Sequence, residues 1–74
     1  VADPKIIFAA ALKANANGII VAHNHPSGNL TASQSDIDLT KKLKGAGSFL
    51  EIQLIDHLII TTEGYFSFAD QGII

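Results

Sequence analysis

Residues 17–28 read N-G-I-I-V-A-H-N-H-P-S-G, an apolar run that leads directly into a pair of histidines. The apolar run, residues 19–22, is β-branched at three of its four positions and is bounded by turn-forming residues. This pattern predicts a short strand that is buried on both faces. Residues 26–29, P-S-G-N, predict a turn directly after the histidines.

A helix is predicted immediately before this strand. Asp3 can cap the first free backbone N–H groups, and Pro4 suits the first helical position because its missing donor costs nothing there. The following residues, I-I-F-A-A-A-L-K-A, are apolar nearly all round, which predicts a largely buried helix that ends at Asn17 and Gly18. A helix followed at once by a buried strand indicates an α/β fold.

A second helix is predicted after the turn. Ser33 and Asp36 have the spacing of a capping box, with Asp in place of the more usual Glu or Gln. The helix is expected to begin near Ser33, to reach Lys44 and to be stopped by Gly45 or Gly47.

The last third of the chain predicts β-structure. Residues 50–55 contain the alternating run L-E-I-Q-L, which is typical of a half-buried strand. The apolar residues 58–61 follow Asp56 and His57, a turn is expected at residues 62–64, and residues 65–68 predict a last strand.

The histidine pair suggests a metal site at the end of the first strand. Residues i and i+2 of a strand point to the same side, so His23 and His25 present two imidazoles to one place while Asn24 points away. Two neutral imidazoles suit a divalent ion such as zinc, and Asp36 can supply a carboxylate if the turn returns the second helix to the strand end. A zinc ion so held lowers the pKa of a bound water to about 7.

Composition excludes several classes of protein. The 74 residues allow one small domain, and the absence of cysteine excludes disulfides and every cysteine-based zinc or redox site. A net charge of -2 gives no electrostatic footprint for nucleic acid, so direct nucleic-acid binding is not expected. No apolar stretch approaches the roughly 20 residues of a membrane-spanning helix, and the lack of cysteine fits a cytoplasmic protein.

Separately, each part of this pattern has a simpler interpretation, since histidines at a strand end are often solvated and Ser-x-x-Asp is often only a helix cap. The joint spacing is more specific. His23, His25, Ser33 and Asp36 together give H-x-H-x7-S-x2-D, which resembles the metal-binding motif of the JAB/MPN (JAMM) metalloprotease family. The strings A-A-L-K-A-N-A-N-G-I-I-V-A, D-H-L-I-I and Y-F-S-F are similar to those of bacterial RadC-type JAB domains.

The resemblance implies that residues 1–74 are a RadC-type JAB/MPN metal-binding domain with one zinc ion. It implies His23, His25 and Asp36 as the zinc ligands, and Ser33 as the catalytic serine that stabilises the oxyanion of a tetrahedral intermediate. The implied fold is a three-layer α/β fold related to cytidine deaminases, with a mixed sheet and flanking helices. The implied activity is hydrolysis of an amide or isopeptide bond in a peptide or protein.

One departure concerns the general base. In the family this base is a glutamate on a strand upstream of the histidine pair, but the only two glutamates here, Glu51 and Glu63, lie downstream. We therefore expect this chain to be the C-terminal part of the domain, without its N-terminal strands. An uncovered sheet edge would also favour self-association into a homo-oligomer.

Other interpretations stay open at this stage. The domain is either the proposed hydrolase or a non-catalytic interaction domain of a RadC-like protein associated with DNA repair. The contiguous H-N-H is not a nuclease motif, and a deaminase would need H-x-E and P-C-x-x-C. Asp56 is expected to form a turn or to orient His57 through a hydrogen bond rather than to bind metal. The open alternative is that the pair supports a metal-binding histidine through a hydrogen bond.

Overall fold

Two helices and three strands make up residues 3–74, the part of the chain that this computed structural model describes. Val1 and Ala2, with which the expected domain begins, lie outside the described residues. In chain order the elements are α1 Pro4–Lys13, β1 Gly18–Asn24, α2 Gln34–Leu50, β2 Gln53–Thr61 and β3 Gly64–Ser67. The predicted α/β class is confirmed. Neither helix of these residues combines the length and apolar character needed to cross a membrane.

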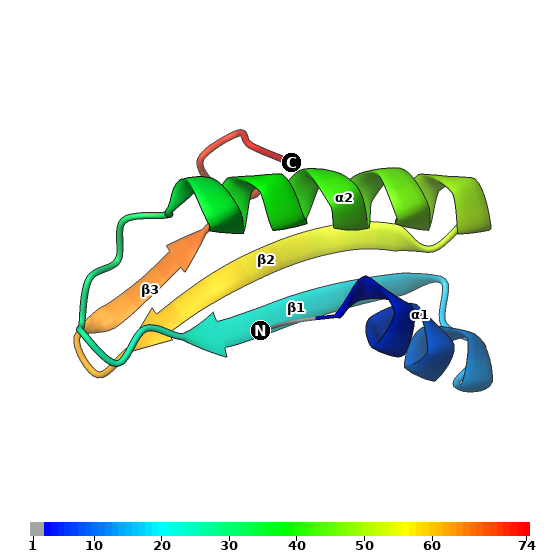
Figure 1. Ribbon diagram of the computed structural model, residues 1–74, viewed down its shortest axis with the longest axis horizontal. Helices are drawn as coiled ribbons and strands as arrows, with labels where there is room; N and C mark the ends of the chain where they lie inside the picture. The colour runs from blue at the N-terminus through cyan, green and yellow to red at the C-terminus, as the bar shows by residue number, and fades with distance from the viewer. Residues whose placement is uncertain (1–2) are drawn as a thin grey trace.

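The strands form one mixed sheet in the order β1-β2-β3 (Figure 1). β1 is parallel to β2, and β2 is antiparallel to β3. Because parallel neighbours cannot be joined by a tight turn, the chain must cross back over the sheet, and α2 makes this crossing. The end of β1 and the beginning of α2 therefore lie at the same end of the molecule (Figure 1).

Both helices pack on one face of the sheet. The buried core cluster draws on both helices and on the start of β2: Phe8, Ala11, Leu43, Ile52 and Leu54. On the opposite face Ile20 is 60% exposed, and Ile60 and Tyr65, which pair across β2 and β3, are exposed as well. β1 is thus half-buried on the face toward the helices and exposed on the other, and the expectation of burial on both faces is wrong.

The first helix is shorter and more exposed than its sequence predicts. Asp3 caps it, accepting a hydrogen bond from the Lys5 backbone N–H at 2.9 Å, and Pro4 opens it, as expected. The helix ends at Lys13, however, because Asn15 takes a left-handed conformation with φ of 55°, and Gly18 already belongs to β1. Only Phe8 and Ala11 of this helix are buried.

The second helix begins as predicted but ends later. Ser33 is its N-cap and forms a full capping box with Asp36. The helix then continues through Gly45 and Gly47 to Leu50, and Glu51 supplies the left-handed residue that ends it, with φ of 59°. Gly47 serves close packing, since a Cβ there would lie 2.2 Å from the Ile52 carbonyl oxygen.

The second strand is continuous through Asp56 and His57 and does not begin at Leu50, which belongs to α2. Its register against β1 shifts between Leu54 and Asp56, so Ile55 is an extra residue in a bulge. The bulge reverses the alternation of inward and outward side chains. Leu54 and His57, three residues apart, are consequently both buried.

Asp56 ties β2 to β3 and to the residues after it. Its carboxylate accepts hydrogen bonds from the Ser67 hydroxyl, from the Ala69 backbone N–H at 3.0 Å and from the His57 backbone N–H at 2.7 Å. Burial raises the pKa of Asp56, but these hydrogen bonds and the charge of His57 outweigh it and hold the pKa below its ordinary value of 3.8. Asp56 is thus a structural residue and neither a turn residue nor a metal ligand.

Two glycines on α2 offer a matched test of the helix packing. We expect Gly47→Ala to lower the free energy of unfolding by about 1–3 kcal/mol, because the new methyl group collides with backbone that cannot move cheaply. Gly45→Ala has open space around its Cβ and should stabilise the helix by about 0.5–1 kcal/mol. Thermal unfolding followed by circular dichroism measures both, and equal effects of the two variants would contradict this account of Gly47.

Asp56 should give the protein an acid-sensitive component of stability. The pKa of Asp56 is lower in the folded than in the unfolded state. Its contribution to the free energy of unfolding is therefore complete above the unfolded-state pKa and is lost as the pH falls through the folded-state pKa. Asp56→Asn should lower the free energy of unfolding at pH 7 by about 1.5–3 kcal/mol and flatten the dependence on pH below about 4. Denaturant unfolding between pH 7 and 2 measures this, with Asp70→Asn, the same substitution at an exposed position, as the control.

Candidate metal centre

The two predicted histidines lie together at the end of β1. His23 is within the strand, and His25 extends its pairing, donating its backbone N–H to the Ile60 carbonyl at 3.2 Å. The two imidazole rings lie 4.9 Å apart between centroids, while Asn24 between them is exposed. The alternation of a strand therefore places both rings on one side, as the sequence predicts.

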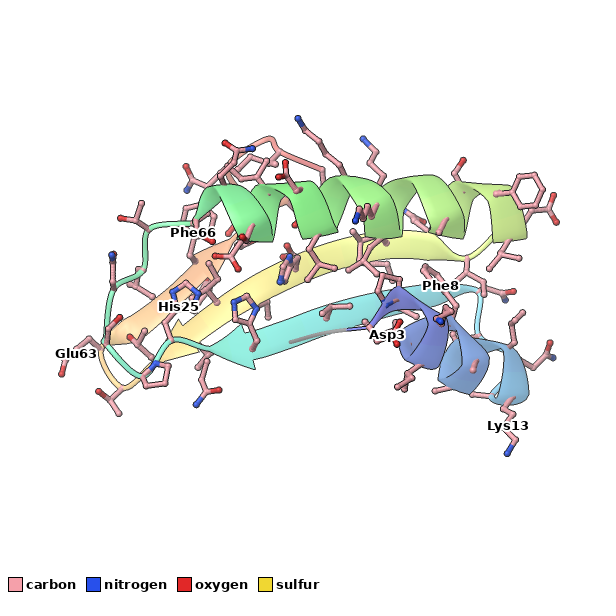
Figure 2. The ribbon with its side chains drawn as sticks, in the orientation of Figure 1. Asp3, Phe8, Lys13, His25, Glu63 and Phe66 are labelled. Atoms are coloured by element: carbon pink, nitrogen blue, oxygen red, sulfur yellow. The ribbon has the colours of Figure 1, made fainter. Side chains whose placement is uncertain are left out.

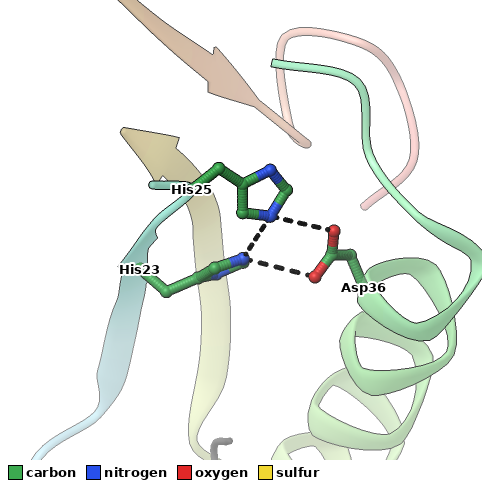
Figure 3. A group of neighbouring side chains, drawn as sticks. All are labelled: His23, His25 and Asp36. Carbon is green, nitrogen blue, oxygen red and sulfur yellow. Dashed lines mark hydrogen bonds and ion pairs between the residues drawn. The ribbon is translucent and has the colours of Figure 1, made fainter. Parts of the chain in front are cut away.

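Asp36 joins them from the first turn of α2. In the capping box the Ser33 backbone N–H donates to Asp36 Oδ2 at 2.9 Å, and the Asp36 backbone N–H donates to Ser33 Oγ at 3.1 Å. This exchange turns the carboxylate toward the strand. Asp36 Oδ1 lies 3.2 Å from His23 Nε2, and Oδ2 lies 3.3 Å from His25 Nε2 (Figure 3).

The loop after β1 orients His25. Its Nδ1 lies 2.8 Å from the Asn29 carbonyl oxygen, and because a carbonyl only accepts, Nδ1 carries the proton. A turn closed by the Gly28 N–H on the His25 carbonyl, with Gly28 at φ of 79°, brings this carbonyl within reach. The Nε2 atom of a neutral His25 therefore presents a lone pair to Asp36 and His23.

Electrostatics favour the ionised form of the carboxylate. Burial raises the pKa of Asp36, but the hydrogen bonds from Ser33 and the charges of His23 and His25 outweigh it and hold the pKa below 3.8. Asp36 is consequently an anion at neutral pH, which is the state that a metal ligand needs.

A third histidine contacts His23 from the neighbouring strand β2. His57 is fully buried on β2, and its Nε2 is 3.0 Å from His23 Nδ1. Its other ring nitrogen is 2.6 Å from the Thr40 hydroxyl oxygen. Burial lowers the pKa of His57 below 6.5, and the charge of His23 lowers it further against the opposing effect of Asp36.

The donor atoms have the spacing of a metal site. The three ligand atoms of His23, His25 and Asp36 lie within 4.8 Å of one another, and the two Nε2 atoms are 3.0 Å apart. Zinc binds nitrogen and oxygen at about 2.0–2.1 Å, so two ligands at a tetrahedral angle are separated by roughly 3.3 Å. The two Nε2 atoms, 3.0 Å apart, and the distance from each Nε2 to its nearer carboxylate oxygen, 3.2 Å to Oδ1 and 3.3 Å to Oδ2, are close to this value. The three residues are therefore a candidate metal-binding cluster.

The cluster opens on a groove between β1 and the starts of both helices. Its volume is about 520 Å³. His23 and Asp36 of the cluster line it, together with Pro4, Val21, Leu39 and Lys42 among others. The side chains of His23 and His25 are 32% and 20% exposed, so the centre can be reached from solvent.

The remaining predicted residues have different outcomes. Ser33 is exposed beside Asp36 as its capping partner, and its catalytic role stays a prediction. Glu51 ends α2, far along the helix from Asp36, and Glu63 lies at the outer end of the β2–β3 turn (Figure 2). Thr40 was not predicted, although its spacing of four residues from Asp36 places both on one face of the helix.

Comparison with known proteins identifies the family of this chain. Residues 1–73 match the family model described as RadC-like JAB domain. The chain is 48% identical over 73 residues to the UPF0758 protein of Flavobacterium johnsoniae, 49% over 69 residues to that of Thermotoga maritima and 53% over 68 residues to that of Haemophilus ducreyi.

These alignments cover 99%, 93% and 92% of this chain but only 32%, 31% and 30% of the respective relatives, so the chain spans about a third of their length. The family match extends over nearly all of the chain and includes the histidine pair, Ser33 and Asp36. The chain therefore belongs to the RadC-like JAB domain family.

Proposed function

We propose that this chain is the zinc-binding part of a hydrolase that cleaves an amide or isopeptide bond in a peptide or protein. The observation that carries the proposal is the convergence of two imidazole nitrogens and a carboxylate at separations of 3.0–3.3 Å, beside an open groove. The proposal concerns the whole protein, of which this chain contributes the ligands.

The charges of this arrangement favour a bound cation. The Asp36 carboxylate is ionised, and His25 has its proton on the nitrogen that faces away from the centre. Electron-rich atoms at such short separations repel one another unless a proton or a metal ion lies between them. A set of two imidazoles and one carboxylate suits zinc, whereas magnesium and calcium prefer sites made of oxygen alone.

When bound, zinc would polarise the substrate carbonyl and lower the pKa of a water that attacks it. The chain's own residues would do the rest of the positioning. His23, His25 and Asp36 would hold the ion on one side and leave the groove side free. The Ser33 hydroxyl, whose oxygen already accepts a hydrogen bond from Asp36, would have its own proton free to donate to a developing oxyanion.

The proton-transfer group is expected from another part of the protein. Neither Glu51 nor Glu63 is part of the cluster, and both are exposed at other places. A general base typically contributes 10²–10⁴-fold in rate, so the ligands alone would make a poor catalyst. The substrate would enter the groove as an extended peptide, since about 520 Å³ accommodates a few residues.

Zinc binding is the first test. The protein should bind one equivalent of zinc, and Asp36→Ala should abolish it, because the anionic ligand is lost while both histidines remain. Asp38→Ala removes the same charge from the next turn of α2, outside the cluster, and should bind zinc like the wild type. Elemental analysis after gel filtration gives the stoichiometry, and zinc retained at one equivalent by Asp36→Ala would refute this ligand set.

Hydrolysis is the second test. The zinc-loaded full-length protein, which includes the expected general base, should cleave amide bonds in a mixture of peptides and isopeptide-linked substrates, detected by mass spectrometry. Ser33→Ala should lower kcat by about 10²–10³-fold while zinc stays bound, and should also weaken the helix cap by about 1 kcal/mol. Ser33→Thr keeps a hydroxyl and should restore both.

The activity outcomes separate the two candidate functions. Full activity of zinc-loaded Ser33→Ala would exclude an oxyanion role for Ser33. One bound zinc with no cleavage of any substrate would instead favour the non-catalytic interaction domain.

A further inference from the structure

We propose that Thr40 and His57 form a positioning pair that fixes the tautomer of His23, so that the Nε2 lone pair of His23 faces the metal centre. The inference rests on the proposed function, because the role of the pair is to make His23 able to bind zinc through Nε2. Neither Thr40 nor His57 is itself a ligand in this proposal.

The direction of the first hydrogen bond is set by a backbone carbonyl. The Thr40 hydroxyl oxygen lies 2.8 Å from the Asp36 carbonyl oxygen, which can only accept, so the hydroxyl donates its single proton there. The 2.6 Å contact between the same hydroxyl and His57 Nδ1 then needs a proton from the ring. His57 must therefore carry its proton on Nδ1.

The second step follows from the chemistry of imidazole. A neutral ring with a proton on Nδ1 has a bare lone pair on Nε2. His57 Nε2 lies 3.0 Å from His23 Nδ1, so His57 accepts and His23 donates. His23 is left with its lone pair on Nε2, the atom that lies 3.2 Å from Asp36 Oδ1 and 3.0 Å from His25 Nε2.

Packing keeps this chain of hydrogen bonds in place. Thr40 and His57 are 1% and 0% exposed, so water does not compete for their polar atoms. The His57 ring stacks on Phe68 with an interplanar angle of 9° and a centroid separation of 4.5 Å. The Phe68 backbone N–H also donates to the His57 carbonyl at 3.0 Å, which fixes the two rings as a unit.

The chain of hydrogen bonds links two of the candidate ligands. It starts at the backbone carbonyl of Asp36, passes through Thr40 and His57, and ends at His23 Nδ1. The helix that supplies one ligand thus sets the tautomer of another ligand on the strand. His25 has a simpler support, the Asn29 carbonyl in an exposed loop.

A purely structural role for these groups is the alternative. Buried polar groups need partners, and the pair would satisfy each other without any effect on zinc. The two roles differ in what happens when the hydroxyl alone is removed. Thr40 contacts Asp36 only at its backbone carbonyl, so only a positioning role links Thr40 to the affinity for zinc.

The test begins with the metal-free protein. Imidazole nitrogens with and without a proton have distinct ¹⁵N chemical shifts, so long-range ¹H–¹⁵N correlation NMR at pH 8 reports each tautomer. We expect the proton on Nδ1 for both His57 and His23. A His23 with its proton on Nε2 alone would overturn the proposal, whatever the variants do.

Thr40→Val is the informative variant, since it keeps the shape of the side chain and removes the hydroxyl. His57 should then show a mixture of tautomers, and the Kd for zinc should rise by about 10–100-fold, as for other residues that orient a metal ligand. Thr40→Ser restores the hydroxyl and should restore both the tautomer and the affinity. The exposed Thr31→Val is the matched control and should bind zinc like the wild type.

His57→Phe provides an independent variant, because it keeps a ring stacked on Phe68 but removes the acceptor for His23. It should weaken zinc binding to a similar extent. Folded Thr40→Val and His57→Phe proteins that bind zinc as tightly as the wild type would refute the positioning role. If one variant fails to fold, the zinc affinity of the other still decides between the positioning and the structural role.

The outcomes distinguish this inference from the proposed function. If Asp36→Ala loses zinc while Thr40→Val and His57→Phe keep the wild-type affinity, the metal site is supported and the positioning role is refuted. Expected tautomers in a protein that binds no zinc mean that the hydrogen-bond chain stands as structure, while the metal site and the positioning role toward it both fail.

Discussion

The parallel pairing of β1 with β2 is the constraint on which the candidate site depends. Two parallel neighbours require the chain to return to the starting end of the sheet, and here α2 makes the return. The helix must therefore begin where β1 ends. Asp36, three positions after the N-cap, then lies opposite His23 and His25 with no special adjustment of the backbone. A ligand set split between a strand and a helix thus follows from the connection that the sheet requires.

The Asp36 carboxylate has two functions in this arrangement. It accepts the Ser33 backbone N–H and so stabilises the beginning of α2, and it faces both imidazoles. The positive end of the helix dipole favours the same negative charge. Because one carboxylate joins the helix start to the strand end, a bound cation would stabilise the fold as well as complete the site. Folding of this region and formation of the centre are therefore linked through one side chain.

The sequence predicts the candidate cluster better than it predicts the residues that contact it. The alternation of a strand places His23 and His25 together, and the capping-box spacing of Ser33 and Asp36 marks the helix start, because both are local rules. The end of α2 was predicted too early, because Gly47 is present for contact with Ile52, a tertiary cause that local rules miss.

The position of His57 escaped prediction for a similar reason. The bulge at Ile55 turns this residue inward, and strict alternation along residues 50–61 does not reveal it. Whether a side chain such as Thr40 or His57 supports a ligand depends on register between elements distant in sequence. One residue of slippage would have exposed His57 and buried Asp56. The two histidines of the H-N-H motif are consequently unequal: an exposed loop orients His25, whereas the contact of His23 with His57 depends on the register between β1 and β2.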